Sequence, residues 1–223
     1  ICLIFPDLYE IGMSNLGFRI LYDIFNQEED VLAERSFAPG TDLEEELRKR
    51  NLPLFSLESF QPLRNFDLLA FSLDSELNYT NLLNILNLGK IPLLREERKE
   101  EDPLILVGGS SSFSPEPISD FVDLFFIGEG EEGAGEIVRS LLQSQGLSRR
   151  EKLSRLSRIE SIYVPSLYKE YMEIKRRVVK DLEAAPFPER WIIPFIQPIY
   201  DRIPFEIMRG CGQGCKFCQA RRI

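Results

Sequence analysis

The segment RGCGQGCKFCQA, residues 209–220, carries three cysteines whose spacing suits a bound metal cluster. Cys211, Cys215 and Cys218 follow the pattern Cys-x3-Cys-x2-Cys, with glycines before and between them. Glycine lets a short loop wrap tightly, and cysteine thiolates are the usual ligands of iron–sulfur clusters. Three thiolates can bind three irons of a four-iron cluster and leave the fourth iron open to a substrate. We therefore predict a [4Fe-4S] cluster on these three cysteines.

Two other uses of the cysteines stay open at this point. A structural zinc ion takes four ligands, but the chain has no histidine and its remaining cysteine, Cys2, lies in a distant apolar run. That alternative leads to a non-catalytic α/β binding module with a structural zinc site at the cysteine trio. A plain iron–sulfur electron carrier would want a fourth cysteine, and the sequence shows none nearby.

The composition sets limits on the class of protein. The chain has 223 residues, 43% of them hydrophobic and 28% charged, with a net charge of −9. This is the composition of a soluble globular protein, and the negative charge argues against broad attraction to nucleic acid or anionic membranes. Without histidine, Ser-His and Cys-His nucleophile chemistry are excluded within these residues. No apolar run approaches the ~20 residues that span a membrane, and we expect a cytoplasmic protein with reduced thiols.

Residues 1–146 alternate apolar runs with amphipathic segments. Short apolar runs bounded by turn residues predict strands buried on both faces of a parallel sheet with helices on each side. We thus expect an α/β domain with an open doubly wound parallel sheet, whose ligands sit beyond the carboxyl ends of its strands. The expected strands are 1–5, 67–73, 103–109 and 121–128, and the expected helices are 14–27, 41–50, 75–89 and 131–146.

The remaining residues predict two further parts. Residues 147–200 combine a short polar helix, a β-hairpin near 171–179 and a proline-rich linker, because five prolines between 186 and 204 favour extended backbone. Residues 201–223 form the last part, in which RIPFEIMRG begins a new strand that leads straight into the cysteines.

The cysteine segment resembles the radical S-adenosylmethionine (SAM) superfamily, whose signature has this spacing and an aromatic residue before the last cysteine, here Phe217. In that superfamily the open iron binds SAM, and the reduced cluster cleaves it to methionine and a 5′-deoxyadenosyl radical. The resemblance implies that Phe217 packs near the adenine of SAM; ordinary core packing is the alternative. It also implies an electron donor such as flavodoxin or ferredoxin.

The resemblance extends along the chain through the segments PDLYEIGMSNLG, ELNYTNLLNILNL and FSPEPISDFVDLFFIGEGEE. Together they resemble an uncharacterised bacterial radical SAM family with an N-terminal cobalamin-binding-like, Rossmann-like domain. The resemblance implies that PFEIMRG is the first strand of a truncated (β/α) barrel, and that this N-terminal fragment alone is inactive. It assigns no catalytic residue, and the substrate could be an RNA, a protein or a small molecule.

The first domain also matches part of a corrinoid-binding pattern. Cobalamin-binding domains often carry Asp-x-His-x-x-Gly after the first strand, then a serine at a strand end and a later Gly-Gly. The corresponding residues are Asp7, Tyr9, Gly12, Ser72, Gly108 and Gly109. Because Tyr9 replaces the histidine, any corrinoid would bind without a protein ligand to cobalt. Otherwise the domain is a relic scaffold or a module that recognises substrate. The glutamates of GEGEE, residues 128–132, are expected to serve the dipole of the helix that follows.

Overall fold

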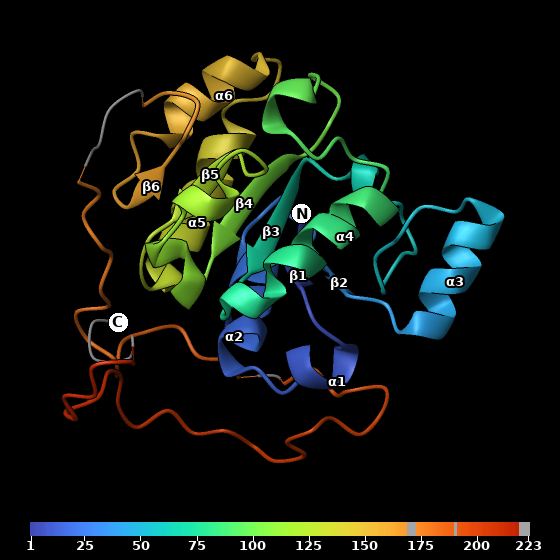
Figure 1. Ribbon diagram of the computed structural model, residues 1–223. Coiled ribbons are helices and arrows are strands. Elements are labelled where there is room, and N and C mark those ends of the chain that lie inside the picture. Colours follow the sequence, from blue (N-terminus) through green and yellow to red (C-terminus); the bar gives the residue numbers. More distant parts are fainter. Residues whose placement is uncertain (169–172, 190, 219–223) are drawn as a thin grey trace.

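A six-stranded sheet forms the centre of the computed structural model, which describes residues 1–168, 173–189 and 191–218 (Figure 1). The strand order is β2-β1-β3-β4-β5-β6; β1 to β5 are parallel, and β6 pairs antiparallel with β5. The first five strands have the flavodoxin-like doubly wound order, which reverses between β1 and β3. The strands are β1 (Cys2–Phe5), β2 (Glu34–Phe37), β3 (Leu68–Ser72), β4 (Leu104–Gly108), β5 (Leu124–Phe126) and β6 (Ile162–Tyr163).

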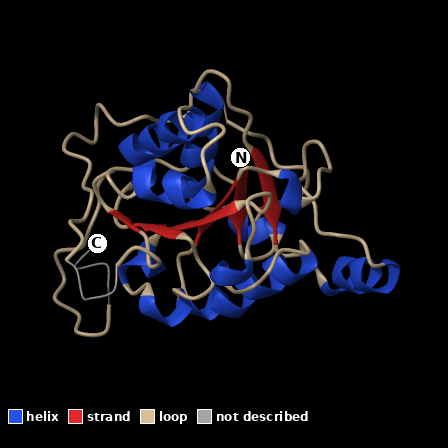
Figure 2. Cartoon of the chain, turned by 90° about the horizontal axis from the view of Figure 1, so that it is seen from above, coloured by secondary structure: helices blue, strands red, loops and turns tan. Residues whose placement is uncertain are grey.

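Helices cover both faces of the sheet, as the view along its edge shows (Figure 2). One face packs against α2, α5 and α6, and the other against α3 and α4. The helices are α1 (Tyr9–Gly12), α2 (Leu16–Gln27), α3 (Thr41–Arg50), α4 (Tyr79–Leu88), α5 (Gly130–Leu142) and α6 (Arg149–Leu156). Short 3-10 turns are η1 (Leu63–Asn65), η2 (Glu76–Asn78), η3 (Arg95–Glu97), η4 (Ser110–Phe113) and η5 (Glu116–Ile118).

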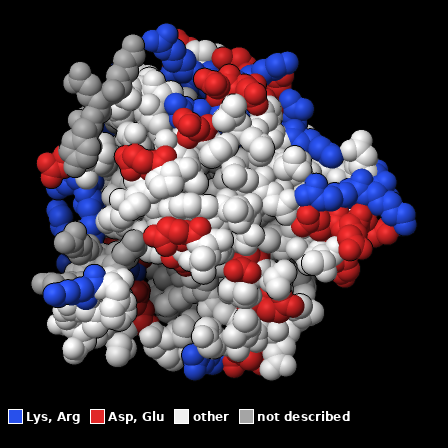
Figure 3. Space-filling view, in the orientation of Figure 1, with Lys and Arg blue, Asp and Glu red and all other residues white. Residues whose placement is uncertain are grey.

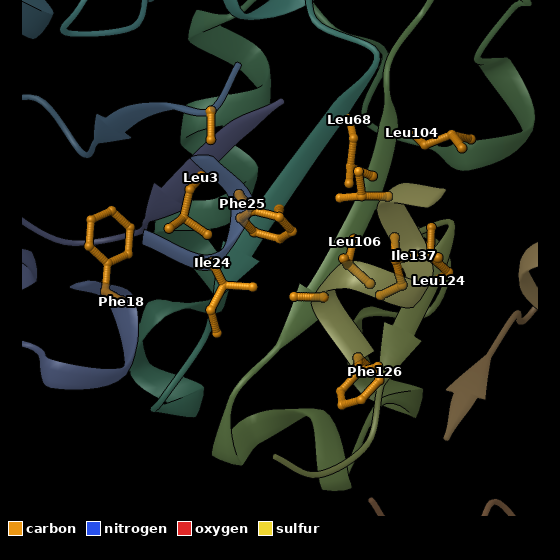
Figure 4. Close-up of a cluster of buried hydrophobic side chains, with 14 of the residues drawn as sticks. Leu3, Phe18, Ile24, Phe25, Leu68, Leu104, Leu106, Leu124, Phe126 and Ile137 are labelled. Carbon is orange, nitrogen blue, oxygen red and sulfur yellow. The ribbon is translucent and has the colours of Figure 1, made fainter. Parts of the chain in front are cut away.

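Two apolar clusters, one on each face, hold these layers together. Successive strand residues point to opposite faces, so Leu3 joins the cluster under α2 and α5 while Ile4 joins the one under α4. Figure 4 shows the first cluster, in which Phe25 and Ile137 come from the two helices. Burying each such side chain contributes about 1.5–3 kcal/mol, which fixes the helices over the sheet.

The sequence predicted an α/β fold with a parallel sheet, and the structure confirms it. The four expected apolar strands correspond to β1, β3, β4 and β5. Strand β2 was not predicted, because Glu34 and Arg35 are polar yet 3% exposed. Residues in the loop before β3 provide partners for both charges. Arg35 pairs with Glu58 at 2.6 Å, and the Ser59 hydroxyl donates to the Glu34 carboxylate at 2.7 Å. The short edge strand β6 was also missed.

The chain after β6 runs along the carboxyl edge of the sheet, past α2 and α1, in orange to red in Figure 1. The hairpin expected over 171–179 lies partly outside the described residues; within 173–179 the described β pairing is the bridge from Arg177 to Gly128. Residues 203–209 carry no strand assignment, since no described segment pairs with them. Within the described ranges, no helix combines the length and apolar character needed to cross a membrane.

Candidate functional site

A cavity of about 440 Å³ opens at the carboxyl end of the sheet. Its walls come from the ends of β3, β4 and β5, the first turns of α2 and α5, and residues 206 and 208–210. This is where open doubly wound sheets bind ligands, beyond the carboxyl ends of the strands. The interior is mainly apolar, and the polar lining residues are Asn15, Ser72, Asp74, Ser110, Glu129, Glu131, Arg176, Glu206 and Arg209.

The loops around the cavity hold one another in place by hydrogen bonds. Asn15, the N-cap of α2, donates to the Asp74 carboxylate at 2.7 Å, across the point where the strand order reverses. Ser110 donates to the Asp74 carbonyl at 2.7 Å. Gly109 has a φ of +95°, and a Cβ there would lie 2.7 Å from the Leu73 carbonyl oxygen. Glycine at 109 therefore allows the loops after β3 and β4 to approach closely.

The structure divides the six residues of the corrinoid-binding pattern into two groups. Ser72, Gly108 and Gly109 line the cavity. Asp7, Tyr9 and Gly12 lie around α1 and do not line it. Only half of the pattern is thus brought to one cavity by the fold.

The residues around α1 have structural contacts of their own. The Asp7 carboxylate accepts a hydrogen bond from the Leu8 amide at 2.8 Å and from the Asn78 side chain at 3.3 Å. A Cβ on Gly12 would lie 2.4 Å from the Phe37 ring, so glycine is needed there for packing. These contacts account for Asp7 and Gly12 without a ligand.

Tyr9 binds the proline-rich linker. Its hydroxyl accepts a hydrogen bond from the Phe195 amide at 2.8 Å, and its ring stacks on Phe195 and packs edge-on against Phe37. Nearby, the Ile199 amide donates to the Glu10 carbonyl at 3.2 Å. The position that would hold a histidine ligand to cobalt is therefore used to dock the chain on itself, and these residues do not fit a lower-ligand role.

Replacing Tyr9 by Phe should loosen this docking without unfolding the domain. The change removes one hydrogen bond, which contributes about 0.5–1.5 kcal/mol, and keeps the ring. We expect the Phe195 amide to exchange with solvent deuterium about two- to tenfold faster, since 1.4 kcal/mol is a factor of ten. Tyr79→Phe is the matched control, because that phenol contacts Ser114 instead of the linker. Equal exchange in all three proteins would contradict the docking role.

The three cysteines of the candidate cluster lie on an exposed loop, residues 210–218, which we call the cysteine loop. All three are free thiols, and the Cys218 amide donates to the Cys215 carbonyl at 3.3 Å. Among the described residues no three potential ligands are gathered closely enough to hold a metal ion, so binding would have to draw the sulfurs together. The donor set itself fits an iron–sulfur cluster, since it consists of three accessible cysteine sulfurs.

Two further sequence expectations can be placed in the structure. Phe217 is 91% exposed, so it is not part of the core and remains available to a ligand. Cys2 is fully buried in β1, and burial raises the pKa of its thiol well above the ordinary value. A thiol that stays protonated is a poor metal ligand, which separates Cys2 from the exposed trio.

Sequence reasoning missed the contact between the cysteine loop and the sheet. Arg209, directly before the loop, donates to Glu131 in the first turn of α5 and to Glu206 at 2.8 Å. The glutamate side chains of GEGEE were expected to serve the helix dipole, and no contact with the cysteine segment was predicted. The sequence offers one hint of this contact, an arginine two residues before Cys211. The sequence does not show that its partner is Glu131.

The residues 128–131, which we call the acidic turn, also depend on a glycine. Gly128 has a φ of +118°, and a Cβ there would lie 2.2 Å from the Arg177 carbonyl oxygen. We expect Gly128→Ala to destabilise the protein by roughly 3 kcal/mol, because it combines backbone strain with a backbone clash.

Gly146→Ala is the matched control, because Gly146 also has a positive φ, +79°, but a Cβ there would meet nothing within 4 Å. It should cost about 1–2 kcal/mol. Urea unfolding compares the two, and an equal loss would contradict the clash.

Comparisons with known proteins identify the family. The family described as radical SAM proteins, N-terminal, matches residues 17–165, more than half of the chain. An uncharacterised protein of Methanocaldococcus jannaschii is 24% identical over 231 aligned positions, which cover all of this chain and 41% of that protein. The chain thus spans less than half the length of this relative. No solved structure gave a significant match. The chain therefore belongs to the family described as radical SAM proteins, N-terminal.

Proposed function

We propose that the full-length protein is a radical SAM enzyme in which Cys211, Cys215 and Cys218 hold a [4Fe-4S] cluster. One observation carries the proposal: a chain of this family has its only exposed thiols, among the described residues, on one short loop beside the ligand cavity. The family match ends at residue 165, so the cysteine motif is independent support. Bound there, such a cluster supplies the electron that cleaves SAM to methionine and a 5′-deoxyadenosyl radical.

The residues of this chain would divide the work as follows. The three thiolates hold the cluster, and exposed Phe217 packs against the adenine of SAM. The α/β domain, residues 1–146, supplies most of the cavity wall, and residues 147–200 connect this domain to the cysteine loop. Residues 201–223 begin the SAM-binding barrel. Gly210 lines the cavity and directly precedes Cys211, so a ligand in the cavity would lie near the cluster.

The cavity would take part of the substrate or a corrinoid. Ser72, Gly108 and Gly109 in its wall support a corrinoid, while the use of Tyr9 to dock the linker means that cobalt would take no ligand from it. The substrate is an RNA, a protein or a small molecule. On the face shown in Figure 3, the described basic side chains form no continuous stripe, and those over α3 on the right lie beside acidic ones. An RNA would therefore need recognition other than through this face.

The proposal includes a cellular setting. Exposed free thiols persist in a reducing compartment, so we place the protein in the cytoplasm. There a flavodoxin or ferredoxin would deliver the electron.

Anaerobic reconstitution of the full-length protein with iron, sulfide, SAM and a reductant tests the proposal. We expect 5′-deoxyadenosine to form only when the reductant is present. A parallel titration with hydroxocobalamin, followed by absorbance, tests corrinoid binding; bound corrinoid should show no change on Tyr9→Phe. Zinc without acid-labile sulfide would instead support the binding module with a structural zinc site, an alternative that the family match does not favour.

A further inference from the structure

The acidic turn is where two later segments of the chain attach to the α/β domain. The first is residues 177–179: the Arg177 amide donates to the Ile127 carbonyl at 2.9 Å, and the Glu129 amide donates to the Arg177 carbonyl at 3.1 Å. The Val179 amide donates to the Glu129 carboxylate. These hydrogen bonds hold residues 177–179 against the acidic turn at the end of β5.

The second segment attaches through Arg209. Its guanidinium makes a two-bond contact with Glu206, from Nε and Nη2, each at 2.8 Å. It also donates to Glu131 and lies 3.4 Å from Glu129. The side chain of Glu131 is 9% exposed and that of Arg209 is 22% exposed, so the contact is mostly withdrawn from solvent. A planar guanidinium that binds carboxylates in this way fixes direction as well as distance.

The charges around this contact make Arg209 hard to replace. Three carboxylates, those of Glu129, Glu131 and Glu206, surround one guanidinium. The hydrogen bonds that Arg209 donates to Glu206 and Glu131 raise the pKa of its guanidinium. Without it the carboxylates would repel one another and push the segment off the turn.

Neighbouring residues offer little other attachment through their side chains. Phe205 is 79% exposed and Ile207 is 87% exposed, so the segment does not lie on the domain by apolar packing at these positions. Arg209 is next to Gly210, which lines the cavity, and the first thiol follows at Cys211. The ion contact is therefore well placed to set where the cysteine loop begins.

We propose that Arg209 is a positioning residue that fastens the start of the cysteine loop to the first turn of α5, next to the cavity. The importance of Arg209 for catalysis rests on the proposed function. The attachment of the cysteine loop to α5 does not depend on that function. The chemistry of the loop and the ligand in the cavity would then be held in a fixed relation by one arginine and the carboxylates of the acidic turn.

Distance measurement by pulsed electron spin resonance tests the attachment without any activity. One spin label goes on Cys211 and one on Ser154→Cys, an exposed position of α6, in apo full-length protein whose other exposed cysteines are replaced. We expect a single narrow distance distribution that is lost in Arg209→Ala and in Glu131→Gln. Arg209→Lys should retain part of the narrow peak, because charge is kept and the two-bond geometry is lost.

Two matched control variants separate the loss of this contact from the loss of a charge in general. Glu132→Gln makes the same change one residue along α5, at a side chain that is 49% exposed, and Arg202→Ala removes an exposed arginine of the same segment. Both should keep the narrow distribution. A distribution unchanged in Arg209→Ala, or broadened equally in the controls, would overturn the proposal.

Kinetic measurements then test whether the attachment matters for the reaction. In reconstituted full-length protein, Arg209→Ala should keep its iron and sulfide content and its KM for SAM while kcat for 5′-deoxyadenosine falls about tenfold, since small misplacements of reacting groups lower rates strongly. An unchanged kcat would refute the catalytic importance. If the parent protein forms no deoxyadenosine, the proposed function fails, and the distance distributions still decide whether Arg209 fastens the loop.

Discussion

Full-length protein carrying Cys215→Ser is expected to lose its cluster completely after anaerobic reconstitution. Serine oxygen is a poor substitute for a thiolate, and with two remaining thiolates the loop has too few ligands. The absorbance of the cluster, its acid-labile sulfide and 5′-deoxyadenosine formation should all disappear together. Cys211→Ser and Cys218→Ser should behave in the same way.

Cys2→Ala is the matched control for this loss. The Cys2 thiol is fully buried and its pKa is raised by burial, so its removal should leave iron and sulfide content unchanged. A lower unfolding midpoint is the expected side effect, because a buried group is truncated in β1. A protein that keeps its cluster without Cys215 but loses it without Cys2 would show that the ligands have been assigned wrongly.

Asp123→Ala should destabilise the α/β domain by about 3–5 kcal/mol, the usual result of leaving a buried charge without its partner. Asp123 precedes β5, and one of its carboxylate oxygens accepts bonds from Arg98 at 2.9 Å, Arg149 at 2.7 Å and the Ile105 amide at 2.8 Å. The side chain of Arg98 is 0% exposed and that of Asp123 is 2% exposed. This network ties the start of β5 to β4, and the acidic turn lies at the other end of β5.

Urea unfolding of Asp123→Ala and Asp120→Ala measures this effect. Asp120 is 77% exposed and pairs with Arg95 at 3.3 Å, so its loss should change stability by about 0–1 kcal/mol. A loss below about 1 kcal/mol in Asp123→Ala would mean that the network is not needed to hold β5.

The sequence was informative where one local pattern determines the outcome. Apolar runs such as LLAFS and LILVG predicted β3 and β4, because parallel strands are buried on both faces. The cysteine spacing predicted the candidate cluster ligands in the same local way. Strand β2 was missed, since its polar residues are buried only through partners such as Glu58, 23 residues from Arg35.

Contacts between distant segments could not be predicted from one sequence. Arg209 and Glu131 are 78 positions apart, and Tyr9 and Phe195 are 186 apart. A tyrosine where the corrinoid-binding pattern has a histidine predicts that a corrinoid would find no cobalt ligand there, but it does not predict that the hydroxyl binds the linker. Such pairs depend on how residues 191–210 lie on the folded α/β domain. Neither the hydrophobic periodicity nor the residue spacing of a sequence predicts that arrangement.

The most direct test of the central claim is electron–nuclear double resonance on the reduced full-length protein, with SAM labelled by ¹⁷O in its carboxylate and ¹⁵N in its amine. If three thiolates leave one iron open, both labels should show hyperfine coupling to the cluster, and the ¹⁷O and ¹⁵N signals should be absent with unlabelled SAM. A cluster that shows no coupling to either label, because a fourth protein side chain occupies that iron, would contradict the account.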